Sequence, residues 1–232
     1  AAEKILREIK PKGIIFLGGS VANFQNGFSN ISVPAVLATL VSDELHFPNL
    51  SMVGVDDRAA AHTAVAHLIA QGHSKIAVLG GPATSFPSRM RRLGAQDAME
   101  QAGLIFDDRL YGLSNYDFES AYHAMNSLLA RRAEFTALFA MSDVIAFGAI
   151  RALVSAGFRV PQDVSVIGFD GITMSRYCVP VMTTIVQPSE QIALQSIELL
   201  INQIEHGAPA QTITLQPELQ QGESVCPCRH PL

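Results

Sequence analysis

Short apolar runs alternate with longer amphipathic or Ala-rich stretches along this chain. Runs such as residues 14–17 and 76–79 are wholly apolar and are followed by glycine, which suits parallel strands buried on both faces. Strands separated by helices of roughly 10–15 residues indicate parallel sheets built from right-handed βαβ units. The predicted strands are 13–18, 34–38, 52–56, 75–80, 137–140, 164–169, 183–186 and 212–215, and the predicted helices are 1–10, 58–71, 88–101, 117–132, 143–155 and 189–205.

Composition limits the class of protein. The chain has 232 residues, of which 48% are hydrophobic, enough to bury one large core or two modest ones. Its apolar runs are too short to span a bilayer, and the start lacks a charged segment followed by an apolar one, so we expect no signal peptide and no membrane partner. Three cysteines do not make a disulfide framework, which fits a reducing cytoplasm.

Charge and spacing exclude other functions. The net charge is −5, whereas a domain that binds DNA by itself usually carries a basic face. The basic cluster Arg89–Arg92 is the single one in the sequence, and we interpret Arg92 as a solvated helix residue. The histidines are scattered and Cys226 and Cys228 resemble ordinary free thiols, so no metal and no cofactor is expected. No nucleophile, acid–base pair or phosphate loop has a recognisable motif, which argues against an enzyme.

Five motifs in order carry the strongest signal. Residues 67–82 combine a helix, a Gly-His turn, a strand and Gly-Pro; Arg91-Arg-Leu-Gly94 opens a helix; Ser142-Asp143 follows a strand; residues 160–170 end in Asp170; and Val179–Pro188 follow as a second strand leading to a helix. An acid at the carboxyl end of a buried strand lies where open α/β sheets bind ligands. In this order the motifs resemble the effector-binding core of the lac/gal repressor family of bacterial transcriptional regulators.

The resemblance implies a fold and a domain organisation. We expect an α/β protein with two similar doubly wound parallel-sheet lobes joined by three crossovers, like a type I periplasmic binding protein. The amino-terminal lobe would hold 1–56 plus 188–216, and the carboxy-terminal lobe 57–187 plus 217–232. Family members begin with a helix-turn-helix module, a hinge and the first strand, helix and strand of the core, none of which is in this sequence. The chain is therefore interpreted as a fragment, with the effector held between the lobes.

The resemblance also implies site residues, each with a plainer alternative. Arg91 would donate to ligand hydroxyls or a carboxylate, or would be a surface helix arginine. Asp170 would accept two adjacent hydroxyls of a sugar, or would be an acidic turn residue. Ser142 and Asp143 could equally cap a helix, and Tyr116 could stack on a ligand ring or pack on its lobe. The expected ligand-binding residues are Arg91, Asp170, Tyr116, Ser142, Asp143, Thr39 and Gln187.

Partners follow from the same resemblance. We expect a small-molecule effector, operator DNA bound through the missing helix-turn-helix module, and a homodimer with helix 143–155 and segment 175–179 near its interface. One arginine and two acids favour a neutral polyol, hence a sugar, although nucleosides and purines are also bound on this scaffold. The alternative is a periplasmic sugar-binding protein of a transporter, which would be a monomer with a signal peptide.

Overall fold

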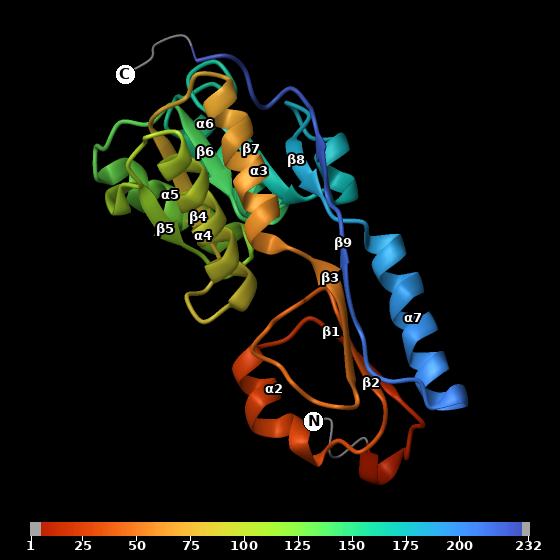
Figure 1. The fold of residues 1–232 in the computed structure, drawn as a ribbon. Helices are drawn as coiled ribbons and strands as arrows, with labels where there is room; N and C mark the ends of the chain where they lie inside the picture. The colour runs from red at the N-terminus through yellow and green to blue at the C-terminus, as the bar shows by residue number, and fades with distance from the viewer. Residues whose placement is uncertain (1–5, 229–232) are drawn as a thin grey trace. The chain divides into compact units, whose positions relative to one another are not determined.

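The structure of this chain is a computed structural model that describes residues 6–228. The chain folds as two compact units, each made from segments that are distant in the sequence. The first unit combines Ala1–Asp56 with Pro188–Gln216, and the second combines Asp57–Gln187 with Pro217–Leu232. The chain therefore passes from one unit to the other three times (Figure 1).

The first unit is a four-stranded parallel sheet with a helix on each face. Its strand order is β1-β2-β3-β9. Helix α7 packs over β1, β2 and β3, where Val36 and Val53 meet Leu199. Helix α2 covers the other face, where the rings of Phe16 and Phe24 lie 5.0 Å apart. The elements are β1 (Ile14–Leu17), α2 (Val21–Gly27), β2 (Ala35–Ala38), β3 (Leu50–Val55), α7 (Ser189–His206) and β9 (Thr212–Leu215).

The second unit is built on a six-stranded sheet of order β10-β8-β7-β6-β4-β5. All pairings are parallel except that between β10 and β8, which is antiparallel. From β4 the chain moves outward to β5, and then returns to β6 and moves outward the other way to β7 and β8. The boundary between β4 and β6 is thus a topological switch point, the place where such sheets bind ligands. The strands are β4 (Ile76–Gly80), β5 (Tyr111–Leu113), β6 (Ala137–Ala140), β7 (Ser165–Asp170), β8 (Thr183–Val186) and β10 (Glu218–Gln220).

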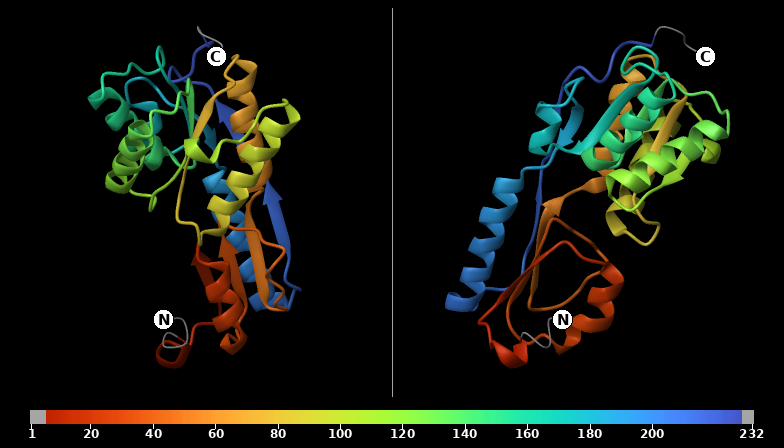
Figure 2. Two further views of the ribbon diagram at one scale, coloured as in Figure 1. Left: turned by 90° about the vertical axis from the view of Figure 1, so that its left-hand side faces the viewer. Right: turned by 180° about the vertical axis from the view of Figure 1, so that it is seen from behind.

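Two helix pairs cover this sheet. Helices α3 and α4 pack together on one face, and α5 and α6 pack together on the other, as the left view of Figure 2 shows. The main core lies between these layers and contains Phe139, Ile167 and Phe169, all fully buried. Such burial on both faces explains why the sequences of these strands are continuous apolar runs. The helices are α3 (Asp57–Ala70), α4 (Phe86–Gln101), α5 (Phe118–Ala130) and α6 (Asp143–Ser155).

The sequence-based elements agree with the structure to within two residues at most ends. The predicted helix 1–10 is described only from residue 6, and residues 6–8 are helical; the earlier residues lie outside the described part. Among the α-helices and strands of the described residues, α2, β5 and β10 were not predicted. They have seven, three and three residues, too short for a hydrophobic period to show.

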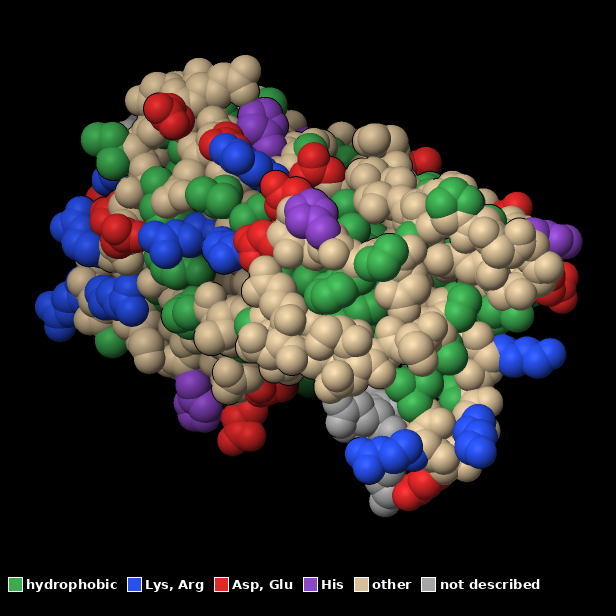
Figure 3. All heavy atoms as spheres, turned by 60° about the horizontal axis from the view of Figure 1, so that its bottom comes forward, with side chains coloured by type: hydrophobic (Ala, Val, Ile, Leu, Met, Phe, Trp, Pro, Cys, Tyr) green, Lys and Arg blue, Asp and Glu red, His purple; other side chains and the backbone are tan. Residues whose placement is uncertain are grey.

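Polar and apolar side chains are mixed on the face of the molecule drawn in Figure 3. On the face drawn in Figure 3, Lys and Arg side chains lie among Asp and Glu side chains rather than in one basic stripe. Within residues 6–228, no helix is both long enough and apolar enough to cross a membrane.

Candidate functional site

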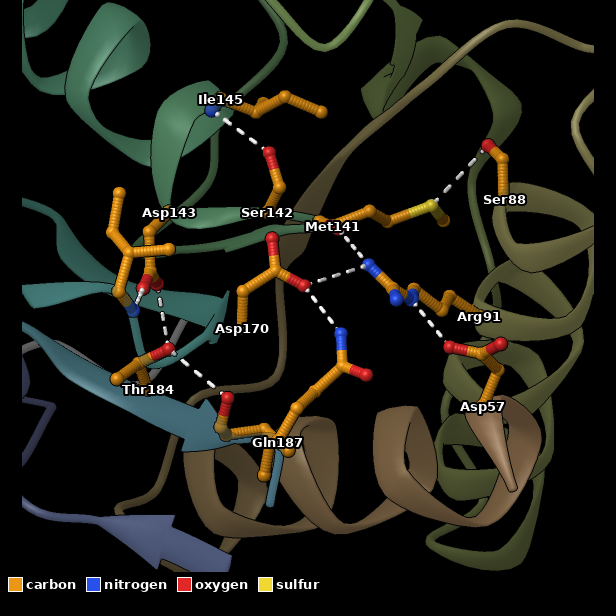
Figure 4. Close-up of polar contacts among 12 residues, drawn as sticks. Asp57, Ser88, Arg91, Met141, Ser142, Asp143, Ile145, Asp170, Thr184 and Gln187 are labelled. Atoms are coloured by element: carbon orange, nitrogen blue, oxygen red, sulfur yellow. Dashed lines mark hydrogen bonds and ion pairs between the residues drawn. The ribbon is translucent and has the colours of Figure 1, made fainter. Parts of the chain in front are cut away.

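Polar side chains gather at the carboxyl ends of β4, β6 and β7 in the second unit (Figure 4). Arg91 comes from α4, which follows β4; Ser142 and Asp143 follow β6; and Asp170 ends β7. Since these strands are neighbours in a parallel sheet, their carboxyl ends meet at the same edge. This edge includes the switch point between β4 and β6, so the topology itself concentrates these groups.

Arg91 is the centre of this cluster. Its side chain is only 7% exposed, and its Nε donates to Asp57 Oδ1 at 2.7 Å. One terminal nitrogen donates to the Met141 carbonyl and lies 3.6 Å from Asp170 Oδ1. The guanidinium also stacks 3.6 Å above the ring of Phe169. Burial by itself lowers the pKa of Arg91, but the charges of Asp57 and Asp170, with Tyr116, outweigh burial and raise that pKa.

Helix packing brings Arg91 to Asp57. Ser85 caps the start of helix α4, because its side chain accepts from Ser88 N–H. The helix passes so close to α3 that a Cβ at Gly94 would collide with the Arg58 carbonyl. Only glycine permits this approach. Because Arg91 lies one turn before Gly94, it faces the start of α3, where Asp57 lies. The glycine of the Arg-x-x-Gly motif therefore has a structural role, and the arginine is not a surface residue.

Asp170 is the partly accessible acid of the cluster. Its side chain is 28% exposed, and Gln187 donates to its Oδ1 at 2.7 Å. Its backbone has φ 109°, a left-handed conformation that is costly for a residue with a side chain. Burial raises the pKa of Asp170, while Arg91 and Gln187 act in the opposite direction. The structure thus brings both Arg91 and Gln187 to the carboxylate of Asp170.

Ser142 and Asp143 begin α6. The Ser142 hydroxyl accepts from Ile145 N–H, so this residue caps the helix. Asp143 is fully buried, and its carboxylate accepts from the Thr184 hydroxyl and from Ile172 N–H. Burial raises the pKa of Asp143 to about 6, against the effect of these two donors. Both residues therefore have partners within the protein.

Tyr116 and Thr39 occupy different surroundings. Tyr116 is half-buried with φ 60°, and its ring lies against Gly81, where a Cβ would collide with it. Its hydroxyl is buried without a partner among the described residues, which is costly unless a ligand supplies one. Thr39 is exposed, with φ 71°, just after β2 in the first unit.

The charges of the cluster determine which ligands it suits. Two carboxylates, Asp57 and Asp170, surround the single guanidinium of Arg91. The ionised cluster is therefore net negative, and Nε and one terminal nitrogen of Arg91 already donate to protein acceptors. Such an arrangement repels an anion but can accept hydroxyl donors through Asp170. No group of three or more His, Cys, Asp or Glu residues within 6–228 has the geometry of a metal site.

Sequence reasoning missed four participants: Asp57, the Met141 carbonyl, the Phe169 ring and Thr184. A signal existed for Asp57, because it follows a buried strand and starts a helix, as Asp143 does. The other three contribute backbone, an aromatic face or a hydroxyl, and no spacing rule indicates such contacts.

Comparison with known proteins matches this architecture to one domain family. A family model for a periplasmic binding protein-like domain matches residues 65–225. The chain belongs to this family. The match covers more than half of the chain and most of the second unit, including Arg91, Asp143 and Asp170.

Relatives of this periplasmic binding protein-like domain are regulators. MalR, an HTH-type transcriptional regulator of Clostridium butyricum, is 34% identical over 94% of this chain and 66% of its own length. The structure of a transcriptional regulator CelR–cellobiose complex has a TM-score of 0.87 at 28% identity, covering 96% of this chain and 68% of that one. A sugar-binding LacI-family regulator from Escherichia coli, complexed with phosphate, has a TM-score of 0.82 at 29% identity. The match covers 97% of this chain and 81% of that one.

These matches confirm the resemblance to the lac/gal repressor family and the α/β fold that it implied. The chain corresponds to the effector-binding core of those regulators, and spans about half to two thirds of the length of the curated relatives it matches.

Proposed function

We propose that this chain is the effector-binding and dimerisation domain of a cytoplasmic transcriptional repressor that senses a neutral polyhydroxylated small molecule, most simply a sugar. The observation that carries the proposal is the cluster of Arg91, Asp57 and Asp170. It is rigidly held, net negative, and exposes one carboxylate that can accept hydroxyls. The two units would be the amino- and carboxy-terminal lobes of that domain.

The recognition chemistry uses the accessible groups of the cluster. Asp170 would accept from two adjacent ligand hydroxyls, and Gln187 and Arg91 hold its carboxylate in place. The half-buried ring of Tyr116 would cover the apolar face of the sugar, and its unpartnered hydroxyl would gain a ligand partner. Ser142 and Thr39 remain predicted contacts. The relatives support the ligand class, because one solved neighbour is a complex with cellobiose.

A panel of uncharged and charged compounds tests the ligand class. The melting temperature of the protein would be measured with cellobiose, glucose, glucose 6-phosphate, cytidine and adenine, since a ligand that binds only the folded state raises it. A shift with a neutral sugar and none with its phosphate supports the proposal. A larger shift with the phosphate than with glucose would contradict the charge argument.

Exposed apolar side chains support a homodimer. Tyr177 is 76% exposed and Val179 is 94% exposed, in the segment after the short 3₁₀ helix η3 (Thr173–Arg176). Phe118, 57% exposed, stacks on Phe147 of α6. Burial of such aromatic and aliphatic groups is typical of the centre of a protein interface. We propose that this surface pairs with the same surface of a second copy.

The alternative, a sugar-binding protein of a transporter, is disfavoured by the relatives, which are named as transcriptional regulators. DNA binding would reside in a helix-turn-helix module outside the sequence given. The intact mass and amino-terminal sequence of the natural protein test this. A preceding helix-turn-helix segment supports the regulator, whereas a cleaved signal peptide would support the transporter.

A further inference from the structure

Asp143 joins three parts of the second unit. It is the first residue of α6 and is fully buried. One carboxylate oxygen accepts from Thr184 Oγ1 on β8 at 2.6 Å, and the other accepts from Ile172 N–H at 2.8 Å (Figure 4). A single side chain therefore connects the start of α6, the loop after β7 and strand β8.

Protein groups surround the carboxylate of Asp143. A Cβ placed on Gly168 of β7 would collide with Asp143 Oδ1, so the carboxylate packs directly against that strand. Both of its oxygens have protein donors, and no part of the residue is exposed. Its influence on an effector would therefore act through the groups that it holds.

Those groups matter for the proposed site. Ile172 lies two residues after Asp170, the acid that would accept the effector hydroxyls. The same residue begins the segment that contains η3 and continues to Tyr177 and Val179, the exposed side chains of the proposed dimer surface. The hydrogen bond from Ile172 N–H to Asp143 thus anchors the chain between the proposed effector site at Asp170 and the proposed dimer surface at Tyr177 and Val179.

We propose that Asp143 is a positioning residue that holds the loop of Asp170 and Ile172 in place, and that protonation of Asp143 loosens this anchor. The importance of the loop for effector binding rests on the proposed function, whereas the anchoring itself does not. A charged acceptor makes a stronger hydrogen bond than a neutral one, so loss of the charge weakens the bond from Ile172 N–H.

The protonation falls within an accessible pH range. Burial is the main cause that raises the pKa of Asp143 to about 6; Thr184 and the N–H groups of Ile172 and Gly171 oppose it, and the charge of Asp170 adds to it. The other titratable group facing Asp143 is the Cys178 thiol, whose own pKa is raised, first by burial and also by Asp143. The anchor is therefore strong above about pH 7 and weaker below about pH 5.

Amide hydrogen exchange of Ile172, resolved by nuclear magnetic resonance in the ligand-free protein, tests the anchor. After correction for intrinsic exchange, protection should rise about fivefold between about pH 5 and about pH 7.5, with a midpoint near 6. Asp143→Asn keeps the shape of the side chain but replaces one of its two acceptor oxygens with an amide nitrogen that donates instead of accepting. It also cannot titrate, so it should give the lower protection at every pH. Thr184→Val removes a donor that lowers the pKa of Asp143, so its midpoint should move to higher pH.

A matched control and a second measurement separate the outcomes. Asp117→Asn changes the acid that caps α5 and should leave the Ile172 profile unchanged. A flat wild-type profile, or an unaltered midpoint in Thr184→Val, would overturn the positioning role. Cellobiose titration of the same proteins tests the proposed function separately: a normal Ile172 profile without binding of any panel compound supports the anchor and overturns the sensor.

Discussion

The buried ion pair of Arg91 and Asp57 gives a sharp stability prediction. Arg91→Met keeps much of the side-chain length but removes the charge, leaving Asp57, 4% exposed, and Asp170, 28% exposed, without their cation. Removing one partner of a buried pair costs about 3–5 kcal/mol, because an uncompensated charge remains. We expect the free energy of unfolding of the second unit to fall by about that amount at neutral pH.

The loss should depend on pH with a defined sign. The pKa of Asp170 is already raised by burial, and Arg91 opposes that rise. Without Arg91 the folded-state pKa of Asp170 rises further. A carboxyl with a raised folded-state pKa destabilises the fold increasingly as pH rises above its unfolded-state pKa, and the full cost is reached above the folded-state pKa. The defect of Arg91→Met should therefore be larger at about pH 8 than at about pH 5. Adding Asp57→Asn should restore part of the lost stability at about pH 8.

Tyrosine fluorescence during urea unfolding measures the free energy of unfolding of the second unit. The chain has four tyrosines and no tryptophan, and all four lie between residues 57 and 187, in the second unit. Arg109→Met, which removes an exposed ion pair with Asp107, is the matched control and should change little. A loss in Arg91→Met no greater than in the control, or independent of pH, would refute the assigned role of the buried pair.

Three further predictions concern the site and the proposed interface. Tyr116→Phe removes a buried hydroxyl without a protein partner, so the unliganded protein should keep or slightly gain stability in urea unfolding while sugar affinity falls; a clear loss of stability would mean that the hydroxyl has a partner. Gly81→Ala should displace the Tyr116 ring and weaken binding of cellobiose in titration calorimetry. Gly27→Ala should not weaken it, because a Cβ there meets nothing within 4 Å. Equal effects of the two substitutions would contradict the packing argument. Tyr177→Asp should shift the protein toward monomer in sedimentation velocity while leaving its circular dichroism unchanged, and an unaltered dimer would place the interface elsewhere.

The sheet and most helices could be predicted because their signals are local. A strand buried on both faces must be apolar throughout. Most helices of 13 or more residues display a hydrophobic period, and α3 is recognised instead from its Ala-rich composition and the glycine that follows it. Elements such as β5 and β10 exist because a neighbouring strand offers hydrogen bonds to a three-residue segment. That cause lies in the tertiary structure, so no local pattern shows it.

In the site, too, some residues could be predicted from the sequence, whereas their partners depend on the tertiary structure. Motif position placed Arg91, Asp170 and Gln187 together, and the structure brings them into contact. The partner of Arg91 depends on how closely α4 approaches α3, and the surroundings of Asp143 depend on contact with β7 and β8. Such distances between segments 29 to 41 residues apart arise only when the core is packed.

Equilibrium titration of neutral sugars into the wild-type protein and Asp170→Asn tests the central claim most directly. The substitution preserves the shape of the side chain and removes the acceptor charge, and a hydrogen bond to a charged group contributes about 1.5–3 kcal/mol, so affinity for the bound sugar should fall about 10–100-fold with the fold intact. Equal affinity of the two proteins, or tighter binding of glucose 6-phosphate than of glucose, would contradict the assignment of this edge as a site for neutral polyols.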